Sequence, residues 1–262
     1  MEQGSIVGLV IVLIGVFVGT IMKGVSPAFL VSVPAALLIV IGGAIGAAFL
    51  GNPMSINKRI GKLIAMAFKG PDLRAADETI NQIVNFSDRA RREGMLSLEE
   101  ECQRIEDPFL RKGLQMAIDG TDPEQVREVL ELEVEAMKDR HSSGANLLTQ
   151  IGIYAPTFGI IGAVIGLIAS MSHLEEPTKL AQGIAAAFVA TFWGVFAANG
   201  LFLPMGAKLK RFSAMEAEHK SMVVEGVLAI QAGANPRVVE EMLLSFLPPA
   251  ERLAAKENRR AA

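Results

Sequence analysis

The sequence has 262 residues, of which 51% are hydrophobic and 20% are charged, and its formal net charge is −3. A chain of this composition either buries one large core or separates apolar from polar residues in blocks along its length. The small net charge and the lack of a basic tract argue against nucleic-acid binding. The single cysteine, Cys102, excludes an internal disulfide framework and a cysteine-rich metal site.

Apolar blocks along the chain predict four membrane-spanning helices. Asp, Glu, Lys and Arg are absent from residues 6–22, 29–50, 147–172 and 180–205. A helix needs roughly 18 to 20 apolar residues to cross the hydrocarbon core, and the first run reaches that length only with its interfacial neighbours. A cleaved signal peptide is the alternative for the first run, but it would require a basic segment where the chain has only Glu2.

Basic residues beside the spans predict their orientation. The connections between spans one and two and between spans three and four hold only Lys23 and Lys179 as basic residues. The other flanks are richer: Lys58, Arg59 and Lys62 follow span two, Lys138 and Arg140 precede span three, and Lys208, Lys210 and Arg211 follow span four. Because basic residues accumulate on the cytoplasmic side, we expect both termini and the section between spans two and three to be cytoplasmic.

The section between spans two and three predicts helices throughout, so the fold class is an all-α integral membrane protein. A helix over residues 75–93 should end at Gly94, and Ser97, with a glutamate three residues later, forms a capping box for the next helix. A further helix should begin at Pro123 and continue through span three, interrupted at most near residues 142–144. Such a helix would be about 75 Å long.

These predictions divide the chain into four parts. Residues 1–50 would hold transmembrane helices 1 and 2, residues 51–146 a cytoplasmic helical domain, residues 147–205 transmembrane helices 3 and 4, and residues 206–262 a cytoplasmic helical tail. Within the tail, we expect one helix from Lys208 to about Gly233 and a shorter one from Pro236 to Phe246.

Small residues recur every four positions on all four spans. They are Gly15 and Gly19, Gly42 and Gly46, Gly162 and Gly166, and on span four Ala186, Ala190, Gly194 and Ala198. In lipid, such ladders let helix backbones approach closely. They could pack the chain's own helices or other subunits. Because four helices offer too little perimeter to bury so many small faces internally, we expect an oligomer to use part of them.

The spans contain no residue that could carry an ion by itself. An ion channel or transporter normally has an ionisable group at membrane depth, whereas these spans offer Pro156, Thr157, Thr191 and Asn199. Pro156 removes a backbone donor and frees a carbonyl near Gly152. If the chain helps to move an ion, the titrating group must therefore come from another polypeptide.

Seven strings resemble the flagellar stator MotA family, in the same order and on the same four-span plan. They are KGVS (23–26), ARREGMLSLE (90–99), DPFLRKGLQMAIDG (107–120), EAMKDRH (135–141), YAPTFGIIGAVIGLI (154–168), AAFVATFWG (186–194) and VVEGVLAIQAGANPR (223–237). The resemblance implies a stator subunit of the bacterial flagellar motor in the inner membrane. MotA-like proteins form a ring of five around two MotB chains, whose aspartate carries the ion, and convert ion flow into torque on the rotor protein FliG.

The resemblance also implies roles for individual residues. Arg91 and Glu99 match the charged pair that contacts FliG, although the helix dipole alone would favour a cation and an acid at these positions. Pro156 and Pro204 match two prolines linked to coupling, and Thr191 matches a threonine of the ion path. The residues assigned to oligomer packing are Gly162, Gly166, Ala186, Gly194 and Ala198.

The resemblance favours protons as the driving ion. Sodium-driven relatives place threonines where this sequence has Ala163 and Ala190. A hydroxyl oxygen can replace part of a sodium ion's hydration shell, whereas a methyl group cannot. A sodium-driven stator of the same family is the alternative.

Two further classes compete with this interpretation. An ExbB- or TolQ-like energiser of periplasmic transport also surrounds a partner's helix, but it has three spans and a different cytoplasmic arrangement. A self-sufficient channel or carrier would need a polar site of its own at mid-membrane, and usually an inverted repeat. No catalytic or phosphate-binding motif is present, and His141, His173 and His219 are far apart, so we expect neither an enzyme nor a metal or cofactor site.

Overall fold

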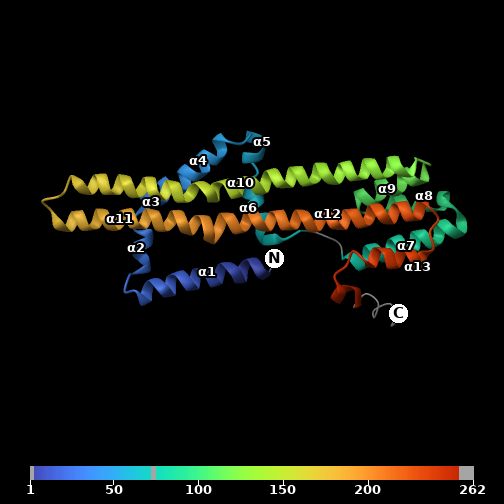
Figure 1. The fold of residues 1–262 in the computed structure, drawn as a ribbon, viewed down its shortest axis with the longest axis horizontal. Helices are drawn as coiled ribbons and strands as arrows, with labels where there is room; N and C mark the ends of the chain where they lie inside the picture. Colours follow the sequence, from blue (N-terminus) through green and yellow to red (C-terminus); the bar gives the residue numbers. More distant parts are fainter. Residues whose placement is uncertain (1–2, 72–74, 254–262) are drawn as a thin grey trace. The chain divides into compact units, whose positions relative to one another are not determined.

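A computed structural model describes residues 3–71 and 75–253 of the chain. These residues form helices and the turns between them, and none of them lies in a strand, so the predicted all-α fold is confirmed. The chain forms two compact units (Figure 1): a membrane unit of residues 1–70 and 140–212, and a second unit of residues 71–139 and 213–262. Each unit thus combines two segments that are far apart in the sequence.

Within residues 3–71 and 75–253, three helices are long and apolar enough to cross a bilayer. They are α1 (Gln3–Met22), α10 (Pro123–Met171) and a continuous helix of α11 (Pro177–Phe196), the π-helix η3 (Ala197–Phe202) and α12 (Leu203–Gln231). The tail helix predicted to begin at Lys208 is therefore not separate, because it continues span four without a break. Basic residues mark the edge of a membrane span, but Lys and Arg are good helix formers and do not end the helix.

The second predicted span is divided. The short helix α2 (Pro27–Val31) is followed by a shorter apolar helix, which comprises α3 (Pro34–Leu37), the π-helix η1 (Leu38–Gly42) and α4 (Gly43–Leu50). Val33, which precedes the proline, takes φ −112° and ψ 76°, outside the helical region. One unbroken helix over residues 29–50 was therefore wrong in its first turns, since Pro34 cannot continue the helix that begins at Pro27.

α10 is one uninterrupted helix of 49 residues, as predicted from Pro123 onward. The Asp122 carboxylate accepts a hydrogen bond from the Glu124 amide at 2.9 Å and so caps the first turn. The interruption considered near residues 142–144 does not occur. Gly144 is instead a packing residue, because a Cβ there would lie 2.8 Å from the side chain of Leu63 on α6 (Ile60–Lys69).

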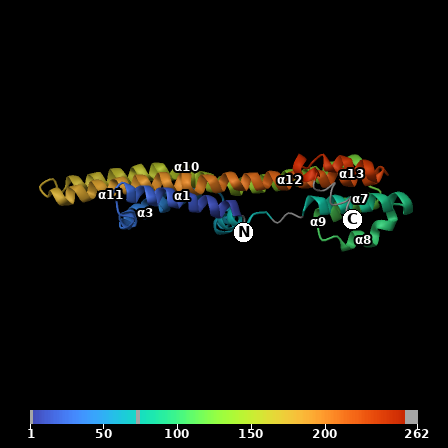
Figure 2. The same cartoon turned by 90° about the horizontal axis from the view of Figure 1, so that it is seen from below.

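Short helices surround the parts of α10 and α12 that belong to the second unit (Figure 2). They are α7 (Ala76–Glu93), the 3₁₀ turn η2 (Met95–Leu98), α8 (Glu99–Arg104), α9 (Pro108–Ile118) and α13 (Pro236–Leu244). The remaining short helix α5 (Met54–Asn57) belongs to the membrane unit. Their core contains fully buried Cys102, whose thiol donates to the Arg111 carbonyl at 3.4 Å. Burial raises the pKa of this thiol, so Cys102 is an inert packing residue.

The turn between α7 and α8 differs from the predicted capping box. α7 does end at Gly94, which takes φ 87°. The Ser97 hydroxyl, however, donates to the Gly94 carbonyl at 2.7 Å, and α8 begins only at Glu99. The last predicted helix also ends earlier than expected, at Leu244.

Candidate functional site

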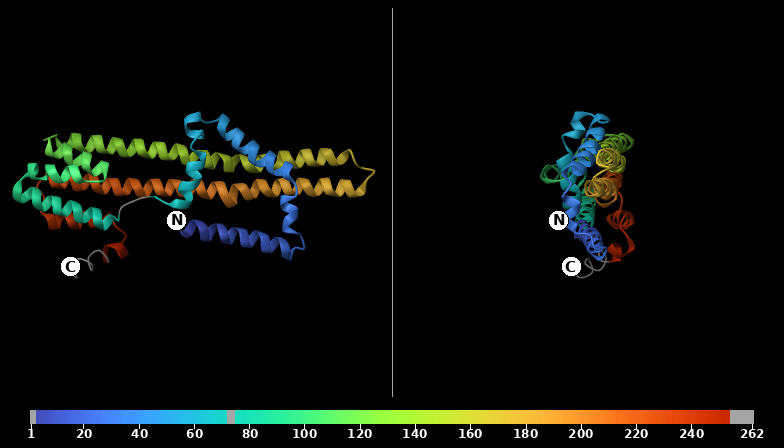
Figure 3. Two further views of the ribbon diagram at one scale, coloured as in Figure 1. Left: turned by 180° about the vertical axis from the view of Figure 1, so that it is seen from behind. Right: turned by 90° about the vertical axis from the view of Figure 1, so that its left-hand side faces the viewer.

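The two long spans α10 and α11 meet along a seam of small residues and lie side by side in the membrane unit (Figure 3). At Gly194, a Cβ would lie 2.8 Å from the Ala155 carbonyl oxygen and 3.0 Å from the Gly159 Cα. At Gly162, a Cβ would lie 2.9 Å from the Cβ of Ala190. The two backbones therefore touch, and only glycine and alanine fit between them.

Pro156 lies at the closest approach of this seam. It lies inside α10 without interrupting the helix, and its Cα is 3.1 Å from the position that a Cβ on Gly194 would take. The neighbouring hydroxyl of Thr157 donates to the Tyr154 carbonyl at 2.6 Å, so it supports the helix around the proline. The predicted coupling proline of span three thus contacts span four directly.

Two predicted ion-path residues lie on α11 in the same seam. Ala190 is 1% exposed and packs against Gly162, while half-buried Thr191 follows it and approaches Gly159. The Thr191 hydroxyl donates to the Ala187 carbonyl of its own helix at 3.4 Å, a long hydrogen bond. Because this bond is weak, the hydroxyl can exchange it for another partner at little cost.

The other two predicted ion-path residues lie differently. Ala163 follows Gly162 on α10 and is half-buried. Pro204 is exposed, and thirteen residues separate it from Thr191, which is about 20 Å along a helix axis. The structure therefore brings Pro156, Ala190 and Thr191 together but places Pro204 away from them.

Pro204 follows the π-helix η3, which the sequence did not predict. Proline has no amide hydrogen and crowds the carbonyl four residues earlier, here that of Gly200, which is part of the widened turn. Pro204 also lines a cavity of about 240 Å³ with residues of α1 and α6, among them Ser5 and Ala67. A proline at this place could have suggested a widened turn, but not its extent.

The glycines assigned to oligomer packing already have neighbours within the chain. Gly162, Gly166 and Gly194 lie in the seam, and Ala198 is buried in the core of the membrane unit, while Ala186 is half-buried. By contrast, a Cβ on Gly15, Gly19 or Gly46 would meet nothing within 4 Å. The small size of the first group is explained by contacts inside the chain, and a contact with another subunit stays a prediction.

The predicted rotor-contact residues flank the turn between α7 and α8. Arg91 lies in the last turn of α7, Glu99 is the first residue of α8, and both are exposed. Their charged neighbours are paired: Arg89 with Glu93 at 2.9 Å and with Glu101, and Arg92 with Asp88 at 3.0 Å. The hydrogen bond to Glu93 raises the pKa of Arg89. Among the described residues, Arg91 and Glu99 form no ion pair and are available to a partner.

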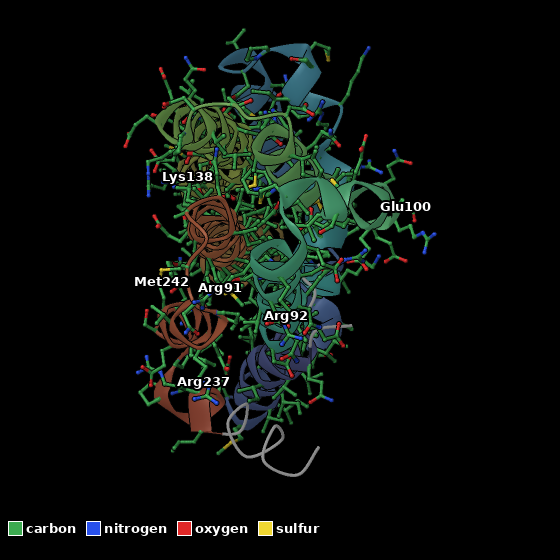
Figure 4. The ribbon with its side chains drawn as sticks, turned by 90° about the vertical axis from the view of Figure 1, so that its right-hand side faces the viewer. Arg91, Arg92, Glu100, Lys138, Arg237 and Met242 are labelled. Atoms are coloured by element: carbon green, nitrogen blue, oxygen red, sulfur yellow. The ribbon has the colours of Figure 1, made fainter. Side chains whose placement is uncertain are left out.

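No role was predicted from the sequence for another exposed arginine of the second unit, Arg237. It is the second residue of α13, the helix packed against α7 (Figure 4). Ser87 of α7 donates to the Ala234 carbonyl at 3.1 Å, shortly before this helix begins. The Arg237 amide donates to the Asn235 side chain, which caps the helix. The string NPR carries the signal, since Asn followed by Pro predicts a helix start and places the arginine in its first turn.

The described residues contain no group of three or more His, Cys, Asp or Glu side chains placed to hold a metal ion. The spans likewise supply no acid or base at depth. The arrangement therefore consists of a close-packed seam with one weakly bonded hydroxyl in the membrane unit, and a turn with two opposite unpaired charges in the second unit.

Known proteins are similar to this chain over nearly its whole length. Two family models match the chain, the MotA/TolQ/ExbB proton channel family over residues 101–222 and the motility protein A N-terminal region over residues 6–94. Motility protein A of Bacillus subtilis is 41% identical over 98% of this chain and 95% of its own length. Chemotaxis protein PomA of Vibrio alginolyticus is 32% identical over 96% of this chain and 98% of its own.

Two solved structures are similar over nearly the whole chain. The flagellar MotAB stator complex from Bacillus subtilis contains a chain that matches with a TM-score of 0.91 and 41% identity, covering 97% of this chain and 99% of that one. MotAB of C. jejuni matches with a TM-score of 0.90 and 33% identity, covering 95% and 97%.

Proposed function

The chain belongs to the MotA/TolQ/ExbB proton channel family and, within it, to the motility protein A group. We propose that it is a stator subunit of the bacterial flagellar motor. It forms an ion channel with a MotB-like partner and converts inward ion flow into torque on the rotor protein FliG. It works in the inner membrane, with both termini in the cytoplasm.

The observation that carries this proposal is the absence of any acidic, basic or histidine side chain from the apolar spans, together with a tightly packed seam beside Thr191. A protein that moves ions needs a site that binds them, so the carboxylate must come from a partner. The two similar structures are complexes named MotAB, which supports a MotB-like chain as that partner. An ExbB- or TolQ-like energiser is disfavoured, because similar proteins of Bacillus subtilis, Borreliella burgdorferi and Helicobacter pylori are all named motility protein A.

A homo-oligomer, most simply a ring of five around two partner chains, follows from the same premise. Large apolar side chains of α1 and α10 are exposed on this chain, for example Ile11 at 64% and Ile168 at 63%. Such exposure in a spanning helix requires lipid or other membrane helices as neighbours. The glycines of α1 at which an added Cβ would meet no described atom within 4 Å offer flat faces for such helices.

The side chains at positions 163 and 190 favour protons over sodium as the transported ion. Ala190 is buried against Gly162, and Ala163 adds only a methyl group, so neither position supplies an oxygen to an ion. A sodium ion that loses its hydration shell needs such oxygens, whereas a proton can pass along water and the partner's carboxylate. We therefore expect this stator to work without sodium.

The torque-contact surface can be tested by charge reversal at Arg91. In cells that express the full stator complex, Arg91→Glu should lower swimming speed several-fold at normal expression, because it places like charge against an acidic residue of FliG. Reversal of that FliG acid to lysine should restore part of the speed.

Lys138→Glu is the matched control, because Lys138 is also an exposed basic residue of the second unit. Swimming in this control should stay near the wild-type speed. If Arg91→Glu swims normally, or if no acidic FliG position restores its speed, Arg91 does not belong to the contact.

A further inference from the structure

Leu96 lies on the turn between Arg91 and Glu99 and is 73% exposed. It is the most exposed large apolar side chain in the described part of the second unit. A single exposed leucine is ordinary on a protein surface. Its meaning therefore depends on how it is held and on what surrounds it.

The turn that carries Leu96 is fixed on both sides. Met95 packs against the core of the second unit, and Leu98 is completely buried. Within the turn, the Ser97 amide and hydroxyl both bond to the Gly94 carbonyl, and the Glu99 amide bonds to the Leu96 carbonyl. Leu96 is therefore presented outward on a fixed backbone, and binding through it loses little conformational entropy.

Charged residues surround Leu96 in a definite order along the chain. Exposed Arg91 and Arg92 precede it, and exposed Glu99 and Glu100 follow it. An exposed apolar side chain that is flanked by charged residues resembles a binding hot spot, in which a central apolar group supplies affinity and polar groups around it exclude water. A lipid surface would not require acidic residues on one flank, whereas a protein partner with both charges would fit.

We propose that Leu96 is the apolar anchor of the torque contact. It would insert into an apolar recess of the rotor protein, between an acidic group that meets Arg91 and a basic group that meets Glu99. The inference rests on the proposed stator function and adds an apolar contribution to a contact otherwise assigned to charges alone. Because the leucine side chain is nonionic, its contribution should persist at high ionic strength, where charge pairs are screened.

The test compares three variants of the full stator complex. Leu96→Ala should weaken binding to the purified rotor protein roughly tenfold to a hundredfold, the range for burial of one leucine side chain. Leu96→Met keeps apolar volume and should bind within a few-fold of wild type. Leu132→Ala is the matched control, because Leu132 is an exposed leucine of the same unit, and it should bind normally.

Binding is measured at low and at high salt, and assembly of each stator complex is checked by size-exclusion chromatography. Normal binding by Leu96→Ala overturns the proposal, and so does a Leu96→Met variant as weak as Leu96→Ala. Loss of complex assembly in Leu96→Ala would also overturn it, because Leu96 would then lie between stator subunits.

The Arg91→Glu experiment separates this inference from the proposed function. If Arg91→Glu and its rotor suppressor behave as expected while Leu96→Ala binds normally, only the apolar anchor is wrong. If neither substitution weakens the contact, the assigned surface itself is wrong.

Discussion

At the scale of single residues, the contact between spans three and four depends on a hydrogen atom at Gly194. A methyl group there would meet the Ala155 carbonyl and the Gly159 and Pro156 Cα atoms, at 2.8 to 3.1 Å. These are backbone atoms of α10, so no side chain can rotate away to make room. The whole helix must shift instead, and Pro156 shifts with it.

We therefore predict that Gly194→Ala destabilises the complex by about 1–3 kcal/mol, the usual cost of overpacking a tight contact. Thermal unfolding of the purified complex measures this, and swimming speed should fall in parallel. Gly61→Ala is the control, because Gly61 is exposed on α6 and a Cβ there meets nothing within 4 Å. A Gly194→Ala complex as stable and as motile as this control would show that the seam is not tightly packed.

Sequence motifs predicted which residues belong to the candidate site, but they did not predict what these residues pack against. Ala190 and Thr191 followed from the string AAFVATFWG, but nothing in that string states that Ala190 is buried against Gly162. The small-residue ladder was equally compatible with contacts inside the chain and between subunits. Which neighbour each small residue contacts depends on the packing of the helices in three dimensions. A pattern of small residues along the sequence does not specify that packing.

At the scale of elements, the break between α2 and α3 is stabilised from span four. Proline has no amide hydrogen, so the Leu30 carbonyl, four residues before Pro34, lacks its usual helical donor. The indole of Trp193 on α11 donates to this carbonyl at 2.7 Å. Leu30 is buried beside Trp193, so an unpaired carbonyl there would be costly.

Trp193→Phe should consequently lower stability by about 1–3 kcal/mol, since it keeps an aromatic ring but leaves the Leu30 carbonyl unsatisfied. Unfolding of the purified complex again provides the measurement. Phe188→Leu is the control on the same helix, because Phe188 is 72% exposed. Equal stability of the two variants would mean that the indole hydrogen bond contributes nothing.

Element boundaries could be predicted where local signals were strong. The start of α10 at Pro123 and the end of α7 at Gly94 followed from caps, and the continuation of α10 into span three was expected with an interruption near residues 142–144 left open. The π-helices η1 and η3 could not be predicted, because a widened turn depends on how neighbouring helices pack. The sequence predicted a separate tail helix from Lys208, whereas α12 continues span four through this position without a break.

At the scale of the whole molecule, the chain separates its two tasks. The membrane unit provides a close-packed seam without an acidic, basic or histidine side chain, and the second unit provides a turn with opposite charges on either side of Leu96 in the sequence. The helices α10 and α12 each contribute residues to both units. α10 therefore carries seam residues in the membrane unit and core residues such as Leu130 in the second unit. The continuous helix of α11, η3 and α12 does the same, with Met222 in the core of the second unit.

The most direct test of this account asks where the ion-carrying group lies. Cells that lack their own stator genes would receive this chain alone, this chain with its MotB-like partner, or this chain with a partner whose membrane aspartate is changed to asparagine. Swimming speed is measured with and without sodium in the medium, and with and without a proton uncoupler. We predict that only the chain with the unaltered partner restores swimming, and that the uncoupler abolishes it. Swimming with the asparagine partner, or swimming that requires sodium and resists the uncoupler, would contradict the account.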